Sequence, residues 1–87
     1  MDSTIYYVSS KNKNKMGKVY KHLKDIGFEE DLMSGYVEIP GSIVFYPIGE
    51  TYGTYYHTEP CAEKRLKVKD IMEISSWDDL KHLKEHI

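Results

Sequence analysis

The sequence contains a single cysteine, Cys61, which excludes an intrachain disulfide and a cysteine-rich structural zinc site. No hydrophobic run approaches the roughly 20 residues that a helix needs to cross a bilayer, and the first residues lack a signal-peptide pattern. Internal repeats and low-complexity segments are also absent. We therefore expect a cytoplasmic protein in a reducing compartment, without membrane association.

Signatures of known chemistry are equally scarce. The glycine-rich loop of P-loop and dinucleotide-binding folds is missing. His82, Glu85 and His86 match the H-x-x-E-H pattern of one zinc protease class, but that site needs a third ligand and a cleft. His57 and Cys61 are separated by Pro60, and nothing marks the thiol as activated. We predict no catalytic residue, no metal site and no cofactor.

The length of 87 residues has room for one domain with one modest core, and residues 1–87 are expected to form it. Its patterns predict an α+β fold in the order β-α-β-β-β-β-α, a mostly antiparallel sheet of about four to five strands with two helices packed on one face. The expected strands are residues 3–8, 35–39, 42–46, 51–58 and 66–74, and the expected helices are residues 16–26 and 76–87.

Capping signals support both helices. Asn12 or Asn14 is suited to begin the first helix, and Gly27 is suited to end it in the left-handed conformation. Ser76 and Asp79 have the spacing of a capping box at the start of the second helix.

Net charge is −2, so total charge selects no partner, but its distribution is uneven. Residues 11–24 hold six of the twelve basic side chains and no acidic one. Lysines near a helix N-terminus are unfavourable unless an anion is bound there. We therefore predict a phosphate or anion site at the strand-to-helix junction of residues 9–18; the alternative is a solvated lysine face. The predicted ligand-binding residues are Ser10, Lys11, Asn12, Lys13, Asn14, Lys15 and Lys18.

The S-x-N-x-x-K spacing of Ser10, Asn12 and Lys15 resembles the opening of inosine triphosphate pyrophosphatases. The resemblance spans about a fifth of the chain, residues 6–23. In that family the motif binds the triphosphate of a noncanonical nucleotide, so the resemblance implies phosphate contacts from these three side chains.

The middle of the chain is rich in tyrosine, an amphipathic residue favoured at interfaces and able to stack on bases. These side chains either complete a small core or present a contact surface, and a mixture of both is expected. The predicted partner-binding residues are Tyr46, Tyr52, Tyr55, Tyr56 and His57.

Two function classes follow from these features. The first is a small non-enzymatic interaction protein that binds a host nucleic-acid-handling or defence factor through the tyrosine-rich face. In size, residue usage and its final strand and helix, the chain is similar to phage and mobile-element accessory inhibitors. The alternative is a nucleotide- or nucleic-acid-phosphate-binding module that uses residues 9–18. A pyrophosphatase-like enzyme is a third, weaker hypothesis, because no acid–base or metal constellation can be assembled.

Overall fold

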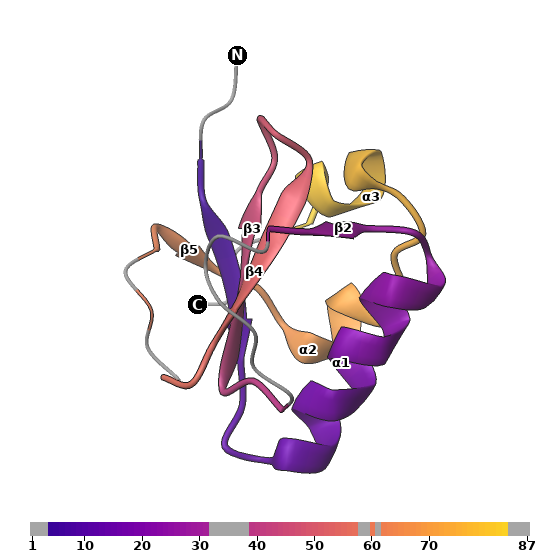
Figure 1. The fold of residues 1–87 in the computed structure, drawn as a ribbon. Coiled ribbons are helices and arrows are strands. Elements are labelled where there is room, and N and C mark those ends of the chain that lie inside the picture. Colours follow the sequence, from indigo (N-terminus) through magenta and orange to yellow (C-terminus); the bar gives the residue numbers. More distant parts are fainter. Residues whose placement is uncertain (1–3, 32–38, 58–59, 61, 84–87) are drawn as a thin grey trace.

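The structure is a computed structural model, and it describes residues 4–31, 39–57, 60 and 62–83. The described strands are β1 (Tyr6–Ser9), β2 (Glu29–Glu30), β3 (Ser42–Tyr46), β4 (Thr51–Tyr55) and β5 (Lys64–Arg65). They form one sheet in the order β2-β4-β3-β1-β5 (Figure 1). The centre is antiparallel, and each edge is a two-residue parallel pair, β2 with β4 and β5 with β1. The predicted small α+β domain is confirmed.

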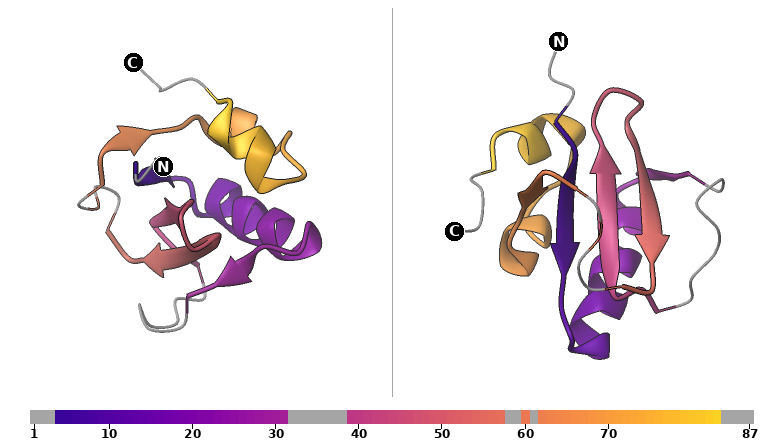
Figure 2. Two further views of the ribbon diagram at one scale, coloured as in Figure 1. Left: turned by 90° about the horizontal axis from the view of Figure 1, so that it is seen from above. Right: turned by 90° about the vertical axis from the view of Figure 1, so that its left-hand side faces the viewer.

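The helices of the described residues are α1 (Lys13–Asp25), α2 (Val68–Ile71) and α3 (Trp77–Lys81). They lie on one side of the sheet (Figure 2). Alternate strand residues point toward them, so Val8, Ile43 and Phe45 share a buried core with Val19 and Leu23 of α1. The sequence predicted two of these helices, and α2 is an addition.

Helix α1 begins three residues before the predicted range of 16–26 and ends one residue earlier, and its capping residues are among those predicted. The Asn12 side chain accepts hydrogen bonds from the backbone N–H groups of Asn14 and Lys15, at 3.0 and 3.3 Å. At the other end, Gly27 has φ +86° and the Phe28 N–H donates to the Leu23 carbonyl at 2.9 Å. This is the hydrogen-bond pattern of a Schellman motif, which needs a left-handed residue and so favours glycine.

The start of α3 departs in one detail from the predicted capping box. Ser76 accepts from the Asp79 N–H at 3.2 Å, as expected. The Asp79 carboxylate, however, accepts from the N–H of Ser75 at 2.9 Å and from its hydroxyl at 3.1 Å. These hydrogen bonds favour the charged carboxylate and lower the pKa of Asp79. Trp77 then stacks on Phe28, with ring centroids 4.4 Å apart.

The strand predicted over residues 66–74 is wrong. Strand β5 ends at Arg65, and the chain then turns into α2, where the Ile71 N–H donates to the Lys67 carbonyl at 3.1 Å. The alternation of apolar and charged residues was misleading because it placed Ile71 on the outer side. Ile71 and Ile74 are instead buried, with the three-residue spacing of a helix face, while Met72 is 37% exposed.

Two other sequence predictions differ in extent. Residues 29–30, which lie outside every predicted strand, form the edge strand β2. The predicted strand at residues 35–39 falls outside the described residues, apart from Ile39.

Candidate functional site

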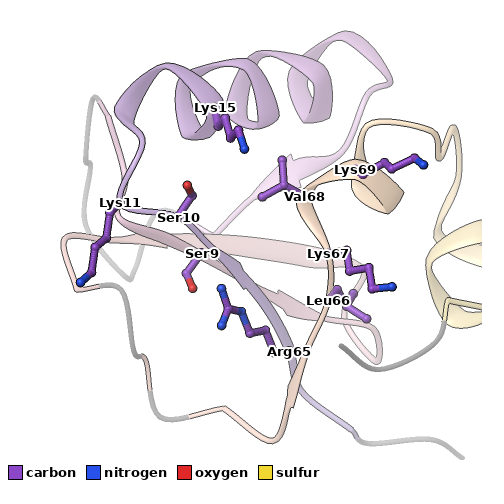
Figure 3. A pocket seen from close by; sticks show the side chains of 9 residues that line it. All are labelled: Ser9, Ser10, Lys11, Lys15, Arg65, Leu66, Lys67, Val68 and Lys69. Atoms are coloured by element: carbon purple, nitrogen blue, oxygen red, sulfur yellow. The ribbon is translucent and has the colours of Figure 1, made fainter. Parts of the chain in front are cut away.

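A groove of about 480 Å³ opens where β1 leads into α1, beside the link from β5 to α2 (Figure 3). It is lined by Ser9, Ser10, Lys11 and Lys15 from the first segment and by residues 65–69 from the second. We call it the basic groove. Its two walls are far apart in the sequence, so the fold assembles it.

Parallel pairing of β1 with β5 brings the two segments together. Tyr7 lies opposite Arg65, and the Leu66 N–H donates to the Tyr7 carbonyl at 2.7 Å. Leu66 is buried in the core, which anchors the start of the link to α2. Because the carboxyl ends of paired parallel strands lie at the same edge of a sheet, the chain after β1 and the chain after β5 face one another.

The groove carries charge of one sign. Five of its nine lining residues are cationic and none is acidic. All five cations are exposed to solvent. Figure 3 shows Lys11 and Lys69 at opposite ends, with Lys15, Arg65 and Lys67 between them. Mutual repulsion among these side chains is reduced when an anion binds, so the groove favours anionic ligands although the whole chain is acidic.

No family model, curated protein or solved structure matches this chain.

The structure brings together only part of the predicted anion site. Ser10, Lys11 and Lys15 line the groove, whereas Asn12, Lys13, Asn14 and Lys18 do not. The last four are exposed elsewhere around the first turns of α1.

The roles expected of Ser10 and Asn12 also change. The Ser10 hydroxyl accepts from the Asn12 N–H at 3.1 Å, and the Asn12 side chain caps α1. These hydrogen bonds already satisfy three of the backbone N–H groups that an anion at the helix N-terminus would use. The side-chain cations, rather than the backbone amides, are therefore the groups offered to an anion here.

Arg65, Lys67 and Lys69 are the groove residues that sequence reasoning missed. The misassigned strand at residues 66–74 hid two of them, because it pointed Lys67 and Lys69 to an outer sheet face. A signal was present in the charge distribution. Residues 64–69 contain four of the six basic side chains that lie outside residues 11–24, and no acidic one.

The predicted tyrosine-rich face is divided between the core and the surface. Tyr52 points into the core with 1% of its surface exposed, so it is not available to a partner. Tyr46 and Tyr55 lie on the opposite sheet face, where their hydroxyl oxygens are 2.7 Å apart. Tyr56 is 77% exposed and His57 is also exposed, both just beyond the end of β4.

We expect the buried Tyr52 to make the fold sensitive to alkali. Burial, with a smaller contribution from the Glu30 carboxylate, raises the pKa of Tyr52 to about 12, from 10.0. The neutral phenol is favoured in the folded state, so this contribution to stability is complete below pH 10 and is lost as the pH rises from 10 to 12. We expect the free energy of unfolding to fall by roughly 2 kcal/mol across this range.

Urea unfolding at pH 8 and pH 11, followed by circular dichroism, measures the first part of this loss, about 1.4 kcal/mol. Tyr52→Phe should reduce the difference between the two pH values, whereas Tyr56→Phe should leave it unchanged because that ring is exposed. An equal alkaline loss in the wild type and Tyr52→Phe would show that other groups cause it.

Neither of the other candidate sites, the histidine–glutamate zinc pattern and the histidine–cysteine pair, is assembled among the described residues. His82 Nδ1 lies 2.7 Å from the Asp78 carbonyl oxygen, while His86, Glu85 and Cys61 fall outside the described residues. Among the described residues, no three His, Cys, Asp or Glu side chains lie together as metal ligands. Across the same residues, no helix combines the length and apolar character that a membrane span requires.

Proposed function

We propose that this protein is a binding module for a phosphate-bearing ligand, a nucleotide or a nucleic acid, held in the basic groove. The observation that carries the proposal is that five cationic residues from two distant segments line one groove, with no acidic residue in the lining. Lysine and arginine side chains form charge-assisted hydrogen bonds with phosphate oxygens, and these are stronger than hydrogen bonds between neutral groups.

Two further features support a ligand at this position. Helix α1 carries no acidic residue in its first turn, where acidic side chains normally interact favourably with the helix dipole. The groove is also of a size typical of ligand sites, about 300–1,000 Å³.

Inorganic triphosphate is the simplest probe of the proposal, and amide NMR the most direct measurement. We expect chemical-shift changes at both walls, residues 9–15 and 65–69, and none in α3. The shifts should decrease between about 0.05 and 0.2 M salt, because all five cations are exposed and screened. Absence of any shift at the lower salt concentration, with triphosphate and with nucleotides, would refute the groove as an anion site.

The alternative proposal is an accessory inhibitor that binds a host protein through tyrosines. The exposed side chain of Tyr56, with the 49% exposed Ile39 just before β3, supports a contact at this end of the sheet. Such an interface would change little with salt, whereas groove binding should weaken steeply.

A further inference from the structure

Tyr56 lies at the same end of the sheet as the basic groove. Ser9, Ser42 and Tyr55 form one row across β1, β3 and β4, and Tyr56 follows directly after this row. Ser10, a groove residue, donates its N–H to the Gly41 carbonyl at 3.4 Å, and the Gly41 N–H donates to the Tyr55 carbonyl at 2.8 Å. The right-hand view of Figure 2 shows the end of β1, the start of α1, the start of β3 and the end of β4 together.

The backbone of Tyr56 lies directly against that of Gly41. A Cβ atom built on Gly41 would lie 2.2 Å from the Tyr56 carbonyl oxygen, so the two backbone segments are in direct contact. The side chain is nevertheless 77% exposed. An aromatic ring is thus presented to solvent from a fixed point two strands away from the groove, about 10 Å at the usual strand spacing.

The arrangement of the cations indicates a chain of phosphates rather than a single one. They are distributed from Lys11 at one end of the groove to Lys69 at the other, instead of surrounding one point (Figure 3). The distance of about 10 Å to Tyr56 corresponds to roughly three stacked nucleotides at 3.4 Å each. A polynucleotide has both the repeated phosphates for the groove and the bases for an exposed ring.

Resting on the proposed function, we infer that the ligand is a single-stranded nucleic acid whose backbone occupies the basic groove and whose base roughly three nucleotides further along stacks on Tyr56. Stacking on an aromatic side chain requires an unpaired base, which selects single strands over duplexes. Arg65 is the only arginine in the chain, so at most one guanidinium group is present to recognise guanine by two hydrogen bonds. Recognition is therefore weakly dependent on sequence.

The test is fluorescence anisotropy with a labelled single-stranded oligonucleotide of about twelve nucleotides, a length within the range of single-strand sites. Tyr56→Ala should weaken binding about tenfold, and Tyr56→Phe should keep it within about twofold, because the ring remains. Neither variant should alter the binding of inorganic triphosphate, which has no base. Ile48→Ala is the matched control, since Ile48 is 57% exposed in the turn between β3 and β4 and lies outside the groove lining.

Each contrary result has its own meaning. Triphosphate binding together with an unchanged oligonucleotide affinity in Tyr56→Ala would overturn the inference and leave the groove as an anion site. Equal binding of a duplex, or equal competition by a polyglutamate peptide, would also overturn it. Failure of every anion to bind would refute the proposed function itself.

Discussion

Replacing Lys15 and Lys67 together by glutamate is expected to weaken phosphate-ligand binding about 100-fold. The two lysines come from opposite walls of the groove, Lys15 from α1 and Lys67 from the link between β5 and α2. The change removes two positive charges from the groove lining and adds two negative ones to it. Hydrogen bonds to charged groups contribute about 1.5–3 kcal/mol each, so the loss of two corresponds to at least this factor.

This variant should keep its fold, which makes the binding result interpretable. Lys15 is the third residue of α1. Glutamate at this position stabilises a helix, because it interacts favourably with the helix dipole and can complete a capping box. Lys67 precedes α2 and its side chain makes no cap hydrogen bond. We expect an unchanged or slightly raised melting temperature in thermal unfolding.

Lys21→Glu with Lys81→Glu is the matched control. It makes the same change in net charge at two exposed lysines outside the groove lining. Isothermal titration with triphosphate, at one salt concentration for all variants, compares the two pairs. An equal loss of affinity in both pairs would mean that total charge, and not the groove, governs binding.

Gly41→Ala is expected to destabilise the fold by about 3 kcal/mol, at the upper end of the usual cost of overpacking. Its new Cβ atom would lie 2.2 Å from the Tyr56 carbonyl oxygen and 3.0 Å from the carbonyl carbon. Both atoms belong to the backbone, so no side-chain rotation relieves the overlap and β3 must move away from the end of β4. A domain of this size has little stability to lose.

Gly17→Ala is a control for which we expect the opposite change in stability. Gly17 lies within α1, and a Cβ atom there would meet nothing within 4 Å. Alanine has the higher helix propensity, so this variant should be more stable by about 1 kcal/mol. Urea unfolding measures both changes. A Gly41→Ala variant as stable as the wild type would mean that the two strands do not approach this closely.

The Gly41→Ala variant also links stability to the site. The Gly41 carbonyl accepts the hydrogen bond from Ser10 in the groove, and its Cα lies against Tyr56. Any variant molecules that remain folded should therefore lose the spacing between the groove and the exposed ring. We expect their oligonucleotide affinity to fall more than their triphosphate affinity.

Helix α1 illustrates what local sequence can predict. Met16, Val19, Tyr20 and Leu23 are buried along one face of the helix. Asn12, one of the two predicted caps, begins the helix, and Gly27 ends it as predicted. Each of these features depends on residues a few positions apart, so the pattern contains the necessary information.

The segment after β5 illustrates where such reasoning fails. Between Leu66 and Ile74 the apolar residues fit both the two-residue spacing of a strand and the three-residue spacing of a helix. The segment is too short for the pattern alone to distinguish the two structures. Packing decides, because Ile71 and Ile74 are buried against the core only when the segment turns helical. That turn is also what directs residues 65–69 toward the groove.

The sequence by itself determined the α+β class, the presence of α1 with its capping residues, and the concentration of basic side chains in residues 11–24. Those properties arise from local periodicity, capping and composition. Only the tertiary structure decided that a second basic segment joins the first, that Tyr52 is buried and that Tyr56 lies at the same end of the sheet as the groove. Each of these depends on the pairing of strands distant in sequence, β1 with β5 and β3 with β4, and on which face of the sheet the helices cover.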